Sequence, residues 1–328
     1  MSKRRQTLGI QMIAALTLFM TIAYLLTPSS DPLSRDGKPH GRVKAAFVVL
    51  VRNSDFDGIR ASIRQMEDRF NRKFHYPYVF LNDDDFTEEF KTFTSSLTEA
   101  DTFYGKVEES MWGYPSFINQ TYAAECREDM ARREIIYGGS ESYRHMCRRL
   151  EPEVNYFCDI DYDVFQMMKD NGYKYGWTIS LTEYMNTIPT LWDTAVKFWK
   201  KYPDYVVLGK DSLMQWLTDD DFETYNGCHF WSNFEIGSLD FLRSEKYIKF
   251  FEHLDETGGF FYERWGDAPV HSLAVASMLR RDEVHFFNDI GYKHNPLMHC
   301  PTETYLQKNC HCPKQENFGM NSLCLSIA

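Results

Sequence analysis

The chain has 328 residues, a formal net charge of −11 and an aromatic content of 16%. A strongly acidic chain lacks the basic face that nucleic-acid phosphates demand, so we exclude a nucleic-acid-binding protein. Residues 43–328 are sufficient for one large domain or two small ones. The aromatic content suits a protein that stacks on sugars, although aromatic residues also fill ordinary cores.

The N-terminal region predicts a membrane anchor. Lys3, Arg4 and Arg5 precede an uncharged apolar stretch over residues 7–27. A helix of about 20 such residues spans a bilayer core, and its basic end is expected to stay in the cytoplasm. A cleaved signal peptide is the alternative, but it has a shorter apolar core and a small-residue cleavage site, which this stretch lacks. The sequence therefore predicts a cytoplasmic tail over 1–6, a transmembrane signal-anchor over 7–27, a polar stem over 28–42 and a lumenal catalytic domain over 43–328.

The cysteines favour an oxidising compartment. An even number of cysteines outside the apolar stretch suggests disulfides in a lumen, although sequence does not give their pairing. A zinc site is the alternative for residues 299–312, where two histidines accompany three cysteines. Their spacing does not follow the common Cys-x-x-Cys pattern, so we predict disulfides there. The eight cysteines are Cys126, Cys147, Cys158, Cys228, Cys300, Cys310, Cys312 and Cys324.

Residues 43–328 alternate strand-like and helix-like segments. The first strand, 43–51, is a nearly continuous apolar run of the kind that is buried on both faces of a sheet. Strands alternating with helices predict an α/β fold with a largely parallel sheet, which binds ligands at the carboxyl ends of its strands. The other predicted strands are 76–81, 154–160, 175–180 and 284–287, and the predicted helices are 59–70, 87–97, 163–169 and 189–201.

The sequence contains no glycine-rich phosphate loop. A bound nucleotide diphosphate must then be neutralised by a metal cation and basic side chains, so the acidic clusters are informative. The charge runs 83–85 and 219–221 have the ordinary interpretation of solvated turns.

Two acidic clusters near residue 155 are better candidates for a metal site. Asp159, Asp161 and Asp163 share one side of an extended chain, and carboxylate oxygens suit Mn²⁺ or Mg²⁺. The alternative is that Asp163 caps the following helix. Glu151 and Glu153 flank a rigid proline just before the same strand. Spacing alone does not decide between the two clusters.

Two later segments mix polar and aromatic residues in a way that indicates a site. In 229–236 (HFWSNFEI), Glu235 stands among bulky aromatics, where an unpaired carboxylate is costly to bury. In 258–272 (GGFFYERWGDAPVHS), aromatics could stack on pyranose faces while Arg264 and Asp267 bond hydroxyls. Asp267 also reads as a plain helix N-cap, and both interpretations can hold. His294 is a further candidate ligand, although a lone histidine is usually an ordinary residue.

The chain resembles the fungal Golgi α-1,2-mannosyltransferase family, which comprises type II membrane enzymes that extend yeast O-linked and N-linked mannans. The resemblance covers nearly all of residues 43–328. It is carried by long and unusual strings: FVVLVRN at 47–53, EDRFNRKFHYP at 67–77, YGGSESYRHMCR at 137–148, and the 229–236 and 258–272 segments.

The resemblance implies a GT-A-like nucleotide-sugar-binding fold with a mixed, mostly parallel central sheet. It also implies transfer of mannose from GDP-mannose to an α-mannoside of protein-linked glycans, with retention of configuration and with Mn²⁺ as cofactor. The residues that match family positions are Glu235 as the catalytic carboxylate, Arg52 and Tyr143 at the donor, Asp267 at the acceptor, and Glu151 and His294 as metal ligands. Arg264 and Trp265 are further acceptor candidates from the chemistry of the 258–272 segment.

One feature departs from the family pattern. An aromatic-rich stretch normally precedes the Glu-Pro motif, but here Arg148 and Arg149 run almost directly into Glu151. The shortened junction motivates an alternative, an inactive paralogue that binds mannan or scaffolds other Golgi enzymes. A lumenal glycoside hydrolase is the third hypothesis, since it also needs two carboxylates but no metal or nucleotide.

Overall fold

The computed structural model describes residues 42–108, 112–146, 154–318 and 324. Two compact units form this part of the chain. The first comprises the described residues up to Gly113 together with Asp163–Gln166, and the second comprises the described residues of 114–162 and 167–328. Among the described residues no helix is long and apolar enough to cross a membrane, and the predicted anchor over 7–27 lies outside them.

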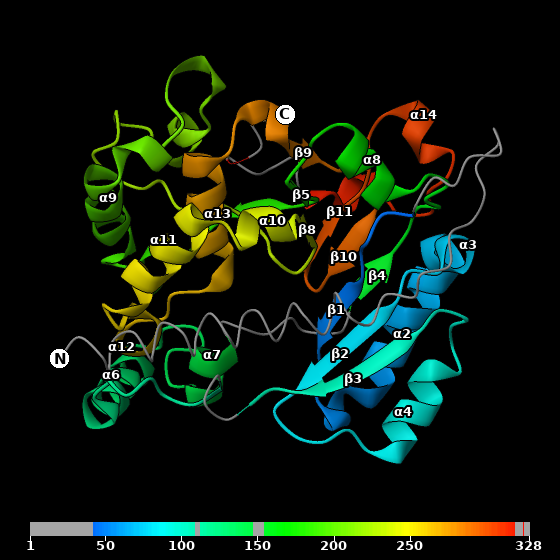
Figure 1. Cartoon of the computed structure of the whole chain (residues 1–328), viewed down its shortest axis with the longest axis horizontal. Helices are drawn as coiled ribbons and strands as arrows, with labels where there is room; N and C mark the ends of the chain where they lie inside the picture. The colour runs from blue at the N-terminus through cyan, green and yellow to red at the C-terminus, as the bar shows by residue number, and fades with distance from the viewer. Residues whose placement is uncertain (1–41, 109–111, 147–153, 319–323, 325–328) are drawn as a thin grey trace. The chain divides into compact units, whose positions relative to one another are not determined.

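The first unit is built on a three-stranded parallel sheet, in the order β1 (Phe47–Leu50), β2 (Tyr78–Asn82) and β3 (Thr102–Lys106). All five residues of the central strand β2 are buried. Figure 1 shows these strands in blue and cyan, with the helices that connect them alongside. The helices are α2 (Phe56–Met66), α3 (Arg72–Phe74) and α4 (Glu88–Ser95), and a π-helical stretch, Glu67–Asn71, joins α2 to α3.

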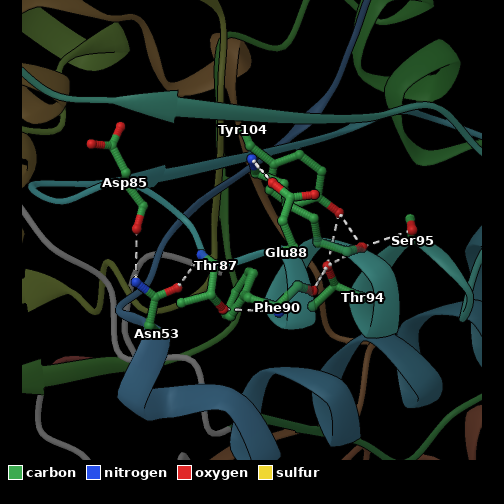
Figure 2. Close-up of polar contacts among 9 residues, drawn as sticks. Asn53, Asp85, Thr87, Glu88, Phe90, Thr94, Ser95 and Tyr104 are labelled. Atoms are coloured by element: carbon green, nitrogen blue, oxygen red, sulfur yellow. Dashed lines mark hydrogen bonds and ion pairs between the residues drawn. The ribbon is translucent and has the colours of Figure 1, made fainter.

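Local hydrogen bonds fix the carboxyl-end loops of this sheet (Figure 2). Asn53, just after β1, donates from Nδ2 to the Asp85 carbonyl at 2.9 Å and accepts the Thr87 backbone N–H at 3.1 Å. The Thr87 hydroxyl in turn accepts the Phe90 N–H at 3.1 Å and so caps α4. One amide side chain therefore ties the loop after β1 to the loop after β2.

The second unit contains three small sheets. In the first, β5 (Tyr175–Trp177) pairs antiparallel with β8 (Glu235–Gly237) and parallel with β9 (Val284–Phe286). In the second, β10 (Tyr292–His294) pairs antiparallel with both β4 (Val154–Tyr156) and β11 (Leu297–His299). The third is the antiparallel pair of β6 (Ser180–Thr182) and β7 (Cys228–Phe230).

Helices accompany these sheets, and one of them lies in the core. Ten of the twelve residues of α13 (Asp267–Met278) are buried, and the two that are not are Asp267 and His271. The helix packs against β7 and α11. The other helices of the chain after Gly113 are α6 (Gln120–Arg132), α7 (Glu141–Met146), α8 (Val164–Asp170), α9 (Leu191–Lys201), α10 (Leu239–Leu242), α11 (Glu245–Asp255), α12 (Gly259–Tyr262) and α14 (Thr304–Gln307).

Three disulfides crosslink the second unit: Cys158–Cys310, Cys228–Cys324 and Cys300–Cys312. They confirm the prediction that bridges rather than zinc occupy residues 299–312. The two histidines of that segment bond to backbone carbonyls instead, His299 to Asn288 and His311 to Phe157.

The structure corrects two details of the predicted fold. The α/β class and the mixed pairing are confirmed, but the pairing is not mostly parallel. Among the described residues, only the β1-β2-β3 sheet and the β5–β9 pair are parallel, and the other four strand pairs are antiparallel. The helix predicted to start with Asp267 as its N-cap instead has Gly266 at that position, and Asp267 is the first helical residue.

Candidate active site

Glu235 opens β8, and its carboxylate is held from two directions. The Tyr175 hydroxyl donates to Glu235 Oε2 at 2.8 Å, and His271 Nδ1 lies 2.9 Å from the same oxygen. Trp177 is the direct cross-strand partner of Glu235, so Tyr175 occupies the diagonal position on the same face of the sheet. Within the described part of the chain Oε1 makes no hydrogen bond, which leaves this oxygen to a ligand.

Asp267 and His271 reach the same place from α13. They are separated by four residues, so they share one face of the helix. This face is the one that the core does not cover. The Asp267 carboxylate bonds to the Ser232 side chain and interacts electrostatically with both Glu235 and His271. One carboxylate therefore contacts the imidazole directly, and a second acts on it electrostatically.

Burial and neighbouring charges change the pKa values of three residues in this cluster. Burial raises the pKa of Asp267 to about 6, even though the neighbouring His271 charge opposes the rise. Burial alone would lower the pKa of His271. The Glu235 carboxylate, with a smaller contribution from Asp267, outweighs this effect of burial and raises the pKa to about 9. Burial also raises the pKa of Tyr175 well above its ordinary value, so its hydroxyl stays a donor. Near neutral pH the imidazole is therefore a cation.

A short segment before Glu235 connects this cluster to His294. The Trp231 ring packs edge-on against the His294 imidazole, with ring centroids 5.2 Å apart. Three positions later, the Phe234 ring contacts Tyr156 and Tyr292 of one sheet and Phe287, which follows β9. Residues 231–235 therefore run from one predicted site residue to another. His294 itself is buried, with 8% of its surface exposed.

The predicted metal pair is described only in part. Glu151 lies outside the described residues, and among the described residues no three His, Cys, Asp or Glu side chains form a metal cluster. His294 lies on β10 directly opposite Val154 of β4, and Glu151 precedes Val154 by three positions in the sequence. Of this predicted pair, the structure therefore describes the surroundings of His294 alone.

The predicted donor and acceptor residues have different environments. Arg264 is buried, and its terminal nitrogens bond the Tyr143 hydroxyl at 2.6 Å and the Glu183 carboxylate at 3.2 Å. Its guanidinium also lies over the Tyr143 ring, 4.9 Å from the centroid. Arg264 is thus placed to orient Tyr143 rather than to meet an acceptor.

Trp265 corrects a prediction. Its ring has no exposed surface and packs against Phe260, and a Cβ on Gly259 would fall 2.3 Å from it. Stacking on an acceptor sugar needs an open ring face, which this residue lacks. Trp265 is a core residue whose indole N–H is satisfied by Glu263 at 2.5 Å.

Arg52 belongs to the first unit, at the carboxyl end of β1. Its guanidinium is ion-paired to Asp55, with contacts of 2.9 and 3.0 Å. Its side chain is more than half exposed at 55%. A nucleotide phosphate could therefore compete for it.

The other acidic clusters have the ordinary structural roles that the sequence analysis allowed, as solvated turns and a helix cap. Asp84 and Asp85 are exposed and face Lys106, while Asp220 accepts hydrogen bonds from Thr218 and Thr224 within its own turn. Asp163 accepts the backbone N–H groups of Phe165 and Gln166 and so caps α8. This capping confirms the alternative that spacing left open.

Sequence reasoning gave no role to three members of the cluster, Tyr175, Ser232 and His271. Only His271 left a signal, because it follows Asp267 by four residues in a segment predicted to start a helix. Tyr175 is separated from Glu235 by 60 residues, and nothing in the sequence reveals strand pairing over that distance.

Comparisons with known proteins place the chain in a family. The model of the glycolipid 2-alpha-mannosyltransferase family matches residues 25–148 and 149–326, in two parts that meet at the shortened junction. Glycolipid 2-alpha-mannosyltransferase 1 of Candida albicans is 53% identical over 298 residues, covering 84% of this chain and 69% of the relative.

Two solved structures share the fold. Core-mannan synthase A (CmsA/Ktr4) of Aspergillus fumigatus, in an Mn/GDP form, is 38% identical with a TM-score of 0.79, covering 89% of this chain and 88% of that one. The mannosyltransferase Ktr4p of S. cerevisiae, in complex with GDP, is 36% identical with a TM-score of 0.82, covering 97% and 90%. The family identified from the sequence strings is confirmed: the chain belongs to the glycolipid 2-alpha-mannosyltransferase family.

Proposed function

We propose that this chain is a retaining α-1,2-mannosyltransferase that moves mannose from GDP-mannose to a mannoside of glycoprotein glycans, with Mn²⁺ as cofactor. The observation that carries the proposal is the Glu235 carboxylate, held at one oxygen by Tyr175 and His271 and open at the other. The comparisons support it, because the relatives are named as mannosyltransferases and two related structures hold GDP, one with Mn.

Glu235 suits the reacting centre. Two donors on Oε2 fix the rotation of the carboxylate, so Oε1 presents a localised negative charge in a fixed direction. Such preorganised charge stabilises the positive charge that develops at an anomeric carbon as the leaving group departs. A carboxylate close beneath that carbon is also the arrangement that retaining glycosidases use.

Asp267 suits the acceptor side. Its carboxylate interacts electrostatically with Glu235, and burial raises its pKa to about 6. A carboxylate that titrates near neutral pH can accept a hydrogen bond, and transiently a proton, from an attacking hydroxyl. Its helix is fixed by the core, so the distance between the two carboxylates changes little.

His294 and Glu151 are the residues we assign to the metal. An imidazole on a buried strand and a carboxylate in the segment that precedes its partner strand fit a divalent cation such as Mn²⁺. When bound, the metal would offset the charge on the departing diphosphate as a Lewis acid. The chain's own part is to hold His294 in place, which Trp231 does by packing against its ring. Arg52 and Tyr143 are proposed for the donor nucleotide, and a GT-A-like fold is part of this proposal.

We also propose a cellular location, which features of the chain support. A type II anchor over 7–27 in the Golgi membrane would place residues 43–328 in the lumen. The three disulfides fit an oxidising compartment. Both features also fit an acceptor on O- or N-linked glycans.

Calorimetric GDP binding with and without Mn²⁺ tests the proposal first, followed by mannose transfer to α-methyl mannoside. Metal-dependent binding and transfer are expected. Metal-dependent GDP binding without transfer would favour the inactive paralogue, for which the shortened junction is the only support. Hydrolysis of a mannoside without nucleotide or metal would favour the glycoside hydrolase.

A further inference from the structure

The histidine on α13 stands out because every charged group near it is one that the proposed chemistry uses. His271 Nδ1 contacts Glu235 Oε2 at 2.9 Å, and Asp267 lies one helical turn earlier. About a fifth of each side chain in the pair remains exposed, 22% for His271 and 20% for Glu235. The pair therefore lies at the edge of the core, where a substrate can reach it.

The groups that face His271 come from three elements. Glu235 comes from β8, Asp267 from its own helix, and Tyr247 from α11 with its ring 6.2 Å away. Tyr175 reaches it only through Glu235. Burial raises the pKa of Tyr247 beyond the ordinary range, so neither tyrosine competes for the charge. The one cation in this set is the imidazolium.

We propose that His271 is a positioning residue of the transfer reaction: its imidazolium clamps Glu235 Oε2 so that Oε1 points at the anomeric carbon. This inference rests on the proposed function, because it assigns the reaction that Glu235 serves. The inference gives a role to His271, to which the sequence analysis gave none.

Electrostatics support this arrangement. Both the Glu235 and Asp267 charges favour the cationic form of His271, and the Glu235 carboxylate is the one that contacts the imidazole, at 2.9 Å. The raised pKa of His271, about 9, keeps the cation in place at neutral pH. Since ten buried residues fix α13, the imidazole cannot follow Glu235 if that side chain rotates.

The test compares His271→Gln with His253→Gln in the full-length chain loaded with Mn²⁺. His253 is the matched control because its hydrogen-bond partner is the Thr194 carbonyl oxygen, at 3.0 Å, rather than a carboxylate. We expect His271→Gln to lower kcat about a hundredfold, as misplacement of a reacting group by ~1 Å does, while KM for GDP-mannose changes less than about twofold. A kcat within about twofold of wild type, or an equal loss in His253→Gln, overturns the proposal.

A second readout needs no activity. The stability that a cationic His271 contributes is full below its ordinary pKa of 6.5 and is lost as the pH rises through about 9. Without metal, the Tm of wild type should therefore fall between pH 7 and 9.5 by about 3–6 °C more than that of His271→Gln. If the His271 variant does not fold, Glu235→Gln carries this measurement, because it removes the partner of the imidazolium. An undiminished fall of Tm in Glu235→Gln overturns the pairing.

The two proposals fail separately. If wild type transfers no mannose from GDP-mannose, the proposed function is wrong, while the Tm readout still reports whether His271 and Glu235 are coupled. If wild type transfers mannose and His271→Gln matches it, only the positioning role is wrong.

Discussion

The chain carries two kinds of acidic site, and they differ in what surrounds the carboxylates. Asp84 and Asp85 in the first unit belong to a dense acidic run, yet they are 78% and 84% exposed, and both form ion pairs with Lys106. Glu235 and Asp267 in the second unit are isolated in the sequence, but they converge on one imidazole in a partly buried setting. A run of acidic residues in the sequence therefore does not indicate a site. A buried carboxylate does, because burying a charge costs free energy.

The largest effect should come from the isolated glutamate. Glu235→Gln keeps the shape of the side chain but removes its charge, so turnover should fall by about a thousandfold or more. GDP binding measured by calorimetry should stay within about twofold, because the residue acts on the sugar. A variant that keeps near-full turnover would remove the distinction between the two kinds of acidic site.

The second effect concerns the metal. His294→Ala should weaken Mn²⁺-supported GDP binding by about ten- to a hundredfold, the usual cost of losing one group from a metal site. Binding without metal should equal that of wild type, which serves as the internal control. An equal loss in both conditions would assign His294 to packing against Trp231 instead.

The third prediction concerns how the stability of the protein depends on pH through Asp267. Folding raises the pKa of Asp267 from 3.8 to about 6. Its protonated form therefore stabilises the folded protein fully below about pH 4, and this contribution is lost as the pH rises through 6. Asp267→Asn should therefore be more stable than wild type at pH 7.5, by about 1–2 kcal/mol after allowance for partial exposure, and equal to it near pH 4. Denaturant unfolding at both pH values checks this.

The same substitution should lower kcat/KM for the mannoside more than it weakens GDP binding. If Asp267→Asn is less stable than wild type at pH 7.5, the charged carboxylate stabilises the folded protein, and the prediction is wrong.

The smallest effect should come from the dense run. Asp84→Asn and Asp85→Asn remove exposed charges that form ion pairs with Lys106, and exposed ion pairs contribute about 0–1 kcal/mol. Transfer activity and Tm should both stay close to wild type. A loss of activity above about tenfold in either variant would mean that exposure does not separate the two kinds of acidic site.

Much of this comparison could be predicted from the sequence, and the rest depends on distance in space. The strings around Glu235 and Asp267 identified the family and the two carboxylates. The even cysteine count predicted bridges but not their pairing. The share of antiparallel pairs was underestimated because a strand-like run such as 175–180 looks the same in either orientation.

The environment of single residues was the least predictable. Trp265 stands in a string rich in site residues, and only the structure shows that Gly259 lets its ring close into the core. His271 stands four positions after Asp267 but acquires a partner only when β8 folds beside α13. Sequence identifies which side chains are unusual, whereas packing decides which of them remain accessible.

The Phe234 ring, wedged among Tyr156, Tyr292 and Phe287, also affects how the enzyme meets its substrate. The residue that follows it keeps the path of its backbone, and Tyr175 and His271 hold its carboxylate at Oε2. The carboxylate therefore has little conformational freedom left to lose, so the entropic cost of ordering the encounter falls on the sugar and its flexible linkages. A chain that anchors its catalytic group in this way selects among substrate conformers instead of adapting to them.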